Sequence, residues 1–574
     1  MKRRDILRHS LQLTLIAASA RFITSNARAA TDGGRYAAAF ARLDAFAESY
    51  MREMNAPGMT LSLADADGTQ RICAYGFEDA ARRTPVDPGR LFHIGSISKS
   101  FAGLCALQLH EEGKLDLRKP IHHYLPWLRF DAATRPLSTH DLLTHAAALP
   151  DGPLFPADPA FRHRPTAAPG TFFHYCNMGY EAVGHLLVAL DQKPLPEVLR
   201  SRILAPLGMT GTEPVITLDA ADRMASSYAA GLNDRPYPRQ GSLIPAAPIA
   251  MSGASGCIAS TAHDMGAYLT MLIRHGRTPN GRLLSEAGFE AFATPHIAAA
   301  EFGEGASYGY GIAVDTLDGH KRVRHTGGMV SFASALEVDL EAGVGAFASI
   351  NAMQGYRPRP VAEYALRLMR AVREGAPLPD PPSLRPSWRV EHAADYAGQF
   401  TEVLGADAAA GPGLNVVADG ERLYLAQGRE RIALEPEDGT PDAFTVLHPQ
   451  WSTFTLLFGR AGNDGKGDVV EVAWGDRWFV SSRHSGPRQF SVPAPWRQYP
   501  GHYRNEDPWI GSHHIVLRKG RLWLNGVTPL EASKDGRFFL RDEPQSPEWV
   551  RFSDIANGAA QRLTLSGADL WRTV

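Results

Sequence analysis

The sequence predicts an α/β unit with a helical subdomain, followed by two all-β antiparallel barrels. Three observations lead to this fold class. Helix and strand patterns alternate over residues 31–375, a proline-rich linker occupies 376–387, and the rest of the chain consists of short strand and turn patterns that occur twice. With 574 residues, 44% of them hydrophobic, the chain is long enough for several domains with cores of their own.

In the first unit, the order of the patterns indicates that its N- and C-terminal parts share one sheet. Asp67-Gly68 separates two alternating segments, which is a hairpin signal. Helices and proline-containing loops over 117–307 then interrupt the strand patterns, as expected for a helical subdomain inserted into a sheet. We expect, in chain order, a helix over 36–53, strands over 59–64 and 69–75, helices over 138–145, 178–190 and 261–275, strands between 308 and 351, and a closing helix over 360–374.

The two barrels are predicted over 388–482 and 488–574. The segment 396–400 returns as 499–503, and two further echoes keep the same order. Repeated short strands with turn signals are typical of lipocalin-like antiparallel barrels. Neither copy contains a nucleophile paired with a base, so we expect the barrels to pack against the first unit or to shape access to it. The further echoes are 422–425 with 521–524 and 434–435 with 530–531.

Residues 1–30 have the layout of a bacterial export signal. The pair Arg3-Arg4 precedes an apolar run over 11–20, and Ala27-Arg28-Ala29 precedes the expected cleavage point before Ala30. The paired arginines resemble a twin-arginine signal. Because the apolar run is shorter than the roughly 20 residues that span a bilayer, we expect a periplasmic or secreted protein without stable membrane insertion after signal removal.

Charge and cysteine content argue against several kinds of partner. The 59 basic residues oppose 61 acidic ones, which leaves a net charge of −2 and no overall field that attracts nucleic acid. The cysteines lack metal-ligand spacing, so we expect no metal site. Their pairing stays open, since an exported chain can form disulfides whereas folding before export favours free thiols. The four cysteines are Cys73, Cys105, Cys176 and Cys257.

Ser96 and Lys99 begin an apolar, helix-forming segment that ends near Gly113. Residues three apart on a helix are neighbours, roughly 5 Å between Cβ atoms, so Lys99 stands beside Ser96. A lysine amine held among apolar side chains loses charge and can accept the serine proton, while the Ser96 N–H can face a developing oxyanion. The alternative is that Ser96 is an ordinary helix N-cap and Lys99 reaches water.

A second candidate stretch contains Tyr175 and Asn177. A phenol becomes a usable base when a cation such as Lys99 stabilises its phenolate. The alternative is that Asn177 caps a helix starting at Met178 and that Tyr175 is a packed aromatic residue.

The third stretch is His325-Thr326-Gly327-Gly328, at the end of an expected strand. Glycines let a substrate backbone come close, and the Gly328 N–H is a candidate second oxyanion donor. His325 and the Thr326 hydroxyl are candidates for binding or orienting a leaving group or a carboxylate. The alternative is a structural histidine that ends a core strand.

Together, Ser96-x-x-Lys99, Tyr175-x-Asn177 and His325-Thr326-Gly327 resemble the serine β-lactamase and penicillin-binding-protein superfamily, nearest the class C β-lactamases. The resemblance covers about 36–374. It implies a penicillin-recognising β-lactamase/transpeptidase-like fold, an acyl-enzyme on Ser96, and proton transfer by Lys99 and Tyr175. The two barrels after this unit resemble the arrangement in D-stereospecific aminopeptidases.

Two departures from the family pattern affect the expected substrate. The family usually has Lys-Thr-Gly where this chain has His325-Thr326-Gly327, so a cation that would bind a β-lactam carboxylate is missing. The family often reads Thr-Ser-Gly-Leu where this chain has Ala146-Ala147-Ala148-Leu149.

We therefore predict an exported serine hydrolase acting on an amide or ester, with a D-amino-acid peptide or amide as the expected substrate and cell-wall peptides among the candidates. No metal or organic cofactor is required. A carboxylesterase or a weak β-lactamase of the same fold is an alternative. A non-catalytic protein that binds cell-wall peptides is a second alternative, of another class.

Overall fold

The computed structural model describes residues 34–131, 134–156, 162–232, 234–353, 357–404, 412–462, 466–540 and 545–573. The predicted export signal at 1–30 lies outside these ranges. Within them, no helix combines the length and the apolar character needed to cross a membrane.

The first domain is built around one antiparallel sheet. Its strands are β1 (Gly58–Asp65), β2 (Gly68–Asp79), β3 (Thr84–Pro85), β10 (Ile297–Ala298), β11 (Ser307–Tyr308), β12 (Ala313–Leu317), β13 (His320–Met329), β14 (Phe332–Asp339) and β15 (Val344–Ile350). Their spatial order is β10-β11-β12-β13-β14-β15-β1-β2-β3. Met59 of β1 faces Tyr75 on one side and Ile350 on the other. The two ends of the first domain therefore share one sheet, as the sequence predicts.

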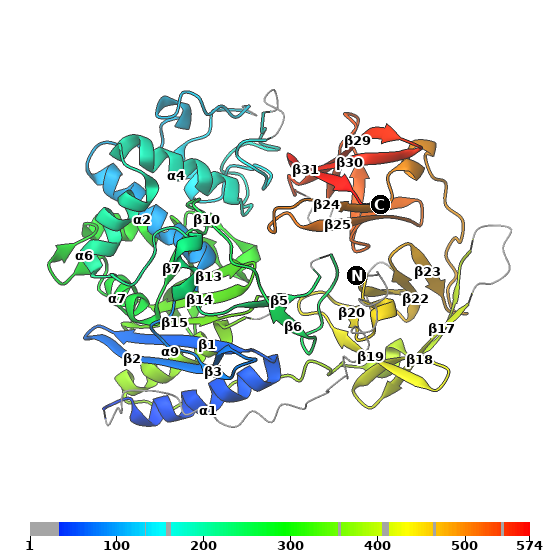
Figure 1. The fold of residues 1–574 in the computed structure, drawn as a ribbon, viewed down its shortest axis with the longest axis horizontal. Coiled ribbons are helices and arrows are strands. Elements are labelled where there is room, and N and C mark those ends of the chain that lie inside the picture. Colours follow the sequence, from blue (N-terminus) through cyan, green and yellow to red (C-terminus); the bar gives the residue numbers. More distant parts are fainter. Residues whose placement is uncertain are drawn as a thin grey trace, which may run out of the picture.

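Helices cover both faces of this sheet (Figure 1). Alternation along β15 separates the two cores, since Phe347 packs with one set of helices and Ala348 with the other. The helices are α1 (Ala37–Met54), α2 (Ser98–Glu111), α3 (Thr139–Leu143), α4 (Asn177–Asp191), α5 (Leu195–Leu199), α6 (Ala205–Leu207), α7 (Ala262–Ile273), α8 (Glu286–Phe292) and α9 (Arg359–Glu374). α1 and α9 pack together on one face, whereas α2, α4, α7 and α8 contribute to the core of the other.

The helical stretch predicted over 117–307 also contains short strand pairs within its described residues. They are β5 (Tyr228–Ala230) with β6 (Leu243–Pro245) and β8 (Arg277–Thr278) with β9 (Gly281–Arg282); β7 (Ala259–Ser260) pairs with β4 (Phe92–His93), just before Ser96. The β5–β6 pair extends from the first domain towards the barrels (Figure 1).

The C-terminal part of the chain forms two closed antiparallel barrels, which confirms the predicted fold class. The first consists of β16 (Gly398–Glu402), β17 (Gly413–Asp419), β18 (Arg422–Gln427), β19 (Glu430–Pro436), β20 (Ala443–Val446), β21 (Leu456–Arg460), β22 (Val469–Trp474) and β23 (Arg477–Val480). The second consists of β24 (Gly501–Arg504), β25 (Ser512–Arg518), β26 (Arg521–Leu524), β27 (Thr528–Ala532), β28 (Phe538–Leu540), β29 (Trp549–Ala556), β30 (Ala559–Leu565) and β31 (Ala568–Arg572).

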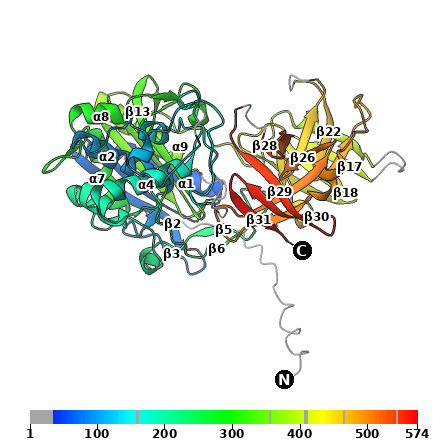
Figure 2. The same cartoon turned by 90° about the horizontal axis from the view of Figure 1, so that it is seen from above.

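The sequence repeat corresponds to the barrel strands. The echoed segments lie at the first, third and fourth strands of each barrel: β16 and β24, β18 and β26, β19 and β27. In each barrel the first strand also pairs with the last, which closes the sheet. Both barrels lie on the same side of the first domain (Figure 2).

All four cysteines are buried free thiols. Burial raises the pKa of Cys73 to about 11 and that of Cys105 to about 12. These side chains are therefore neutral core residues near neutral pH.

Candidate active site

Ser96 lies in a tight turn, η1 (Gly95–Ile97), which leads directly into α2. Gly95 has a φ of 53°, in the left-handed region that glycine adopts without strain. A Cβ atom at Gly95 would lie 2.8 Å from a carbonyl oxygen of β13, and one at Gly327 would lie 1.8 Å from the carbonyl oxygen of Ile94. The third motif therefore packs backbone against backbone on the turn that carries Ser96.

Lys99 is fully buried, and its Nζ atom makes three hydrogen bonds. Nζ lies 3.1 Å from Oγ of Ser96 and donates to Oδ1 of Asn177 at 2.7 Å and to the backbone oxygen of Ser255 at 2.8 Å. The alternative in which Lys99 reaches water is therefore wrong. The contact with Ser96 has the distance needed for proton transfer between the two groups.

The electrostatic surroundings of Lys99 favour its neutral form. Burial lowers the pKa of its amine to about 7, and the negative charges of Asp151 and Glu181 limit that decrease. A large share of the amine is then unprotonated near neutral pH, so it can accept the proton of Ser96.

Tyr175 lies beside Lys99. Nζ of Lys99 is 4.7 Å from the centre of its ring. Its hydroxyl is buried and makes no hydrogen bond of good geometry among the described residues, but it lies close enough to the Ser96 hydroxyl for that group to affect its pKa. Burial raises the pKa of this phenol, and the Ser96 hydroxyl lowers it only in part. Tyr175 is therefore a neutral phenol at rest, so the arrangement favours Lys99 over Tyr175 as the group that first takes the serine proton.

Asn177 connects Lys99 to Asp151. Its amide nitrogen Nδ2 donates to Oδ2 of Asp151 at 2.8 Å, while its backbone N–H donates to Oδ1 at 2.7 Å. The backbone N–H of Met178 also donates to Oδ1, at 3.2 Å. Asp151 thus satisfies the first N–H groups of α4, and the alternative in which Asn177 caps this helix is wrong. Sequence reasoning did not identify Asp151, which lies far from α4 along the chain.

His325 is buried, and both of its ring nitrogens are hydrogen-bonded within the protein. Nδ1 donates to the backbone oxygen of Thr326 at 2.6 Å, so Nε2 accepts from the hydroxyl of Tyr308 at 2.8 Å. Burial, and then the charge of Lys99, lower the pKa of His325 to about 3, so the ring is neutral. The expected role of His325 and Thr326 in substrate binding stays a prediction. The role of Gly328 as an oxyanion donor is likewise a prediction.

The second barrel contacts the wall of this site. Oε1 of Glu548 accepts from the backbone N–H of Asp151 at 2.6 Å and from Nε2 of His174 at 2.9 Å. A Cβ atom at Gly152 would lie 1.9 Å from the backbone oxygen of Ser566, so the two domains are in tight backbone contact here. Burial lowers the pKa of His174, but the hydrogen bond and charge of Glu548 outweigh it and raise the pKa overall. Sequence reasoning did not identify Glu548.

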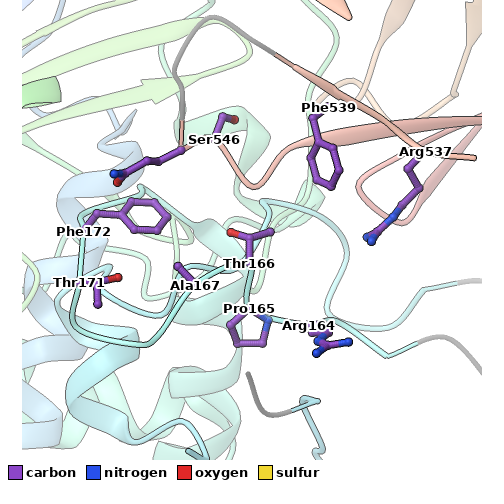
Figure 3. Close-up of a pocket in the computed structure, with 10 residues that line it drawn as sticks. Arg164, Pro165, Thr166, Ala167, Thr171, Phe172, Arg537, Phe539 and Ser546 are labelled. Carbon is purple, nitrogen blue, oxygen red and sulfur yellow. The ribbon is translucent and has the colours of Figure 1, made fainter. Parts of the chain in front are cut away.

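A pocket of about 600 Å³ lies between the second barrel and the segment that leads to Tyr175. Figure 3 shows side chains of both domains around it. Its lining includes Arg164, Thr166 and Phe172 of the first domain and Arg537, Phe539 and Ser546 of the second barrel.

The family match covers most of the first domain. The beta-lactamase family model matches residues 43–371, which is more than half of the chain. The chain belongs to the beta-lactamase family. Members of this family are generally serine hydrolases, and the family match coincides with the domain that holds Ser96, Lys99 and Tyr175.

The similar proteins are distant in sequence. Protein Rv1367c of Mycobacterium tuberculosis is 26% identical over 290 residues, 43% of this chain and 72% of that protein. A beta-lactamase of Providencia stuartii is 27% identical over 206 residues, 34% of this chain and 51% of that enzyme. Among solved structures, the octameric penicillin-binding protein homologue from Pyrococcus abyssi has a TM-score of 0.53 and 24% identity, over 77% of this chain and all of that chain. That likeness concerns the fold alone.

Proposed function

We propose that this protein is an exported serine hydrolase that forms an acyl-enzyme on Ser96 and cleaves amides of D-amino acids or their short peptides. The observation that carries the proposal is the fully buried Lys99, whose Nζ lies 3.1 Å from Oγ of Ser96 and whose pKa is lowered to about 7 by burial. An amine that is partly neutral near neutral pH and lies beside a serine hydroxyl can accept the serine proton, which is the property that a general base needs.

The reaction follows from these positions. Neutral Lys99 takes the proton of Ser96 while Oγ forms a bond to the substrate carbonyl carbon. The backbone N–H groups of Ser96 and Gly328 stabilise the oxyanion. Lys99, with Tyr175 as a second proton carrier, protonates the leaving amine as its bond to carbon breaks. A water molecule then attacks the acyl-enzyme and gives its proton to Lys99. Lys99 passes this proton to Oγ as the bond between Oγ and the acyl carbon breaks, which releases the acid and regenerates Ser96 and neutral Lys99.

The charges around the site support a substrate with a free amino group. His325 is neutral and enclosed, so it supplies no cation for a substrate carboxylate. Two carboxylates, those of Asp151 and Glu548, lie on the wall formed with the second barrel. A protonated amine suits these two carboxylates better than the carboxylate of a β-lactam does. This preference concerns the wall at Asp151 alone, since Arg164 and Arg537 line the adjoining pocket. The D configuration of the substrate rests on the resemblance of the three-domain arrangement to D-stereospecific aminopeptidases.

The experiment is mass spectrometry of the intact protein after treatment with a fluorophosphonate, a penicillin and a D-alanyl ester. Wild type and Ser96→Ala are compared. We expect a stable adduct of the fluorophosphonate and a transient acyl adduct of the D-alanyl ester, both on wild type alone. A D-alanyl amide should then be hydrolysed faster than its L-alanyl counterpart.

The other functions predict different results. A penicillin adduct, whether stable or hydrolysed, in place of the D-alanyl adduct indicates a β-lactamase. Equal hydrolysis of D- and L-alanyl esters without amide cleavage indicates a carboxylesterase. No adduct with any reagent, together with equal binding of cell-wall peptides by wild type and Ser96→Ala, overturns the catalytic proposal.

Export is tested separately, by fractionation of cells that produce either the unaltered chain or the double variant in which Arg3 and Arg4 are both replaced by lysine.

A further inference from the structure

Three side chains that the reaction does not use meet where the first domain touches the second barrel. Asp234 lies in the connection between β5 and β6, while His502 lies on β24 and His514 on the neighbouring strand β25. Oδ2 of Asp234 is 3.7 Å from Nε2 of His502 and 3.8 Å from Nε2 of His514. All three donor atoms lie within 4.8 Å of one another. This arrangement brings together one carboxylate and two imidazoles from separate domains.

The strand pairing fixes the two imidazoles. His502 and His514 face each other directly in the register of β24 and β25. Their rings are stacked, with centres 4.3 Å apart and an angle of 14° between the ring planes. Both Nε2 atoms are buried and have no hydrogen-bond partner among the described residues. The distances to Asp234 are too long for hydrogen bonds, so two buried polar atoms point at a carboxylate without reaching it.

The surrounding hydrogen bonds orient these groups towards a shared ligand. The Thr573 hydroxyl lies 3.3 Å from the backbone oxygen of His502, to which it donates, and 2.8 Å from Nδ1 of the same residue. It therefore accepts from Nδ1–H, which leaves the lone pair on Nε2. Asp234 is held by Arg235, whose Nε and Nη2 atoms donate to its two oxygens at 2.8 and 3.2 Å. Such supporting contacts are typical of metal-ligating histidines and carboxylates.

We propose that Asp234, His502 and His514 bind one divalent transition-metal ion of the zinc class, which ties the first domain to the second barrel. Two imidazoles and a carboxylate suit such an ion better than calcium or magnesium, which prefer oxygen ligands. Tetrahedral zinc with bonds of about 2.0–2.1 Å separates its ligand atoms by about 3.3 Å. Binding therefore requires the stacked rings of His502 and His514 to rotate out of their nearly parallel arrangement, so that both Nε2 lone pairs face one ion. The fourth position would be left for water, so the site differs from structural zinc sites with four protein ligands, and its expected structural role rests on its place between the two domains. The ion has a structural role, and the proposal is independent of the proposed hydrolase activity.

The test uses the full mature chain without a polyhistidine tag. Metal content after dialysis against Zn²⁺ is measured by elemental mass spectrometry, and Co²⁺ is titrated while its visible absorption is followed. We expect one ion per chain and an absorption typical of tetrahedral Co²⁺. Asp234→Asn and His514→Gln should weaken binding at least about 100-fold, because each removes a ligand. The matched control is His513→Gln, which changes the neighbouring residue of β25 and should bind like wild type.

A second readout reports the structural role. Saturating Zn²⁺ should raise the thermal unfolding midpoint of wild type and of His513→Gln, and a chelator should reverse the rise. In Asp234→Asn neither should move the midpoint. Because this variant keeps the shape of the side chain, circular dichroism should show it folded. Absence of stoichiometric binding by wild type, or equal affinity in wild type and Asp234→Asn, overturns the proposal.

Discussion

The carboxylate of Glu548, in the second barrel, accepts hydrogen bonds from His174 at 2.9 Å and from the backbone N–H of Asp151 at 2.6 Å. Asp151 in turn holds Asn177, whose Oδ1 accepts from Nζ of Lys99 at 2.7 Å. A continuous series of hydrogen bonds therefore runs from the barrel to the lysine beside Ser96. We therefore expect the barrel to influence the position of this lysine.

Glu548→Gln tests this relationship. The amide oxygen can still accept from Asp151, but the negative charge beside His174 is lost, so the hydrogen-bonded series is weakened. We expect kcat on a D-alanyl amide to fall about 10-fold with a smaller change in KM, because small displacements of a catalytic group lower the rate more than binding. The control is Glu506→Gln, an exposed glutamate of the same barrel. Equal kinetic constants in Glu548→Gln and wild type would show that the barrel only packs against the first domain.

The pKa of Lys99 sets the pH dependence of the reaction. Only the neutral amine accepts the proton of Ser96, so kcat/KM should rise with pH and level off above about 7. The negative charge of Glu181 raises the pKa of Lys99, so Glu181→Gln should move this limb of the profile to lower pH. The exposed Glu290 is the control site, where Glu290→Gln should leave the profile unchanged. A shift to higher pH in Glu181→Gln would contradict the assignment of Lys99 as the base.

Gly327 is expected to be essential because of its position against the Ser96 turn. The added methyl group of Gly327→Ala would lie 1.8 Å from the backbone oxygen of Ile94, so β13 must move away from the turn. We expect kcat/KM to fall about 100-fold, since a shift of about 1 Å at the reacting groups costs that much. The control is Gly413→Ala in β17, where the nearest atom is 3.8 Å away. If a folded Gly327→Ala variant kept full activity, the tight packing would have no catalytic consequence.

The short-range features of the active site could be predicted from sequence because they depend on helical spacing. Ser96 and Lys99 are three residues apart, and the structure places them together in the turn and first residues of α2. Two long-range features were also predicted correctly. The shared sheet of the first domain follows from the order of the hydrophobic patterns, and the two barrels follow from the sequence repeat. The contact between Asp151 and Glu548 could not be predicted, because the two residues are 397 positions apart and no local sequence pattern indicates it.

The burial of His325 could not be predicted either. His325 is expected from the sequence at the end of a strand, whereas β13 continues through the motif to Met329. The local sequence does not distinguish a histidine that faces substrate from one that faces the core. Its environment is decided by Tyr308, from a neighbouring part of the sheet, whose hydroxyl donates to the buried ring. The cluster of Asp234, His502 and His514 was missed for the same reason, since its three residues come from two domains and have no ligand-like spacing.

The structure explains one consequence of the alanines that follow His145, and this gives a further prediction. Ala148 has a φ of 54°, the left-handed conformation, at the position where the family pattern has glycine. An alanine in this conformation is strained by about 1 kcal/mol, so Ala148→Gly should relieve that strain. Ala147→Gly is the matched control, because Ala147 is also buried but is not among the residues with positive φ. Both substitutions remove one methyl group and add the same freedom to the unfolded chain.

We therefore expect the free energy of unfolding of Ala148→Gly to exceed that of Ala147→Gly by about 1 kcal/mol, measured by urea denaturation of the first domain's transition. Equal free energies of unfolding for the two variants would mean that Ala148 is not strained. The turn would then be held by the hydrogen bond from the Thr166 N–H to the backbone oxygen of Ala148, at 2.9 Å.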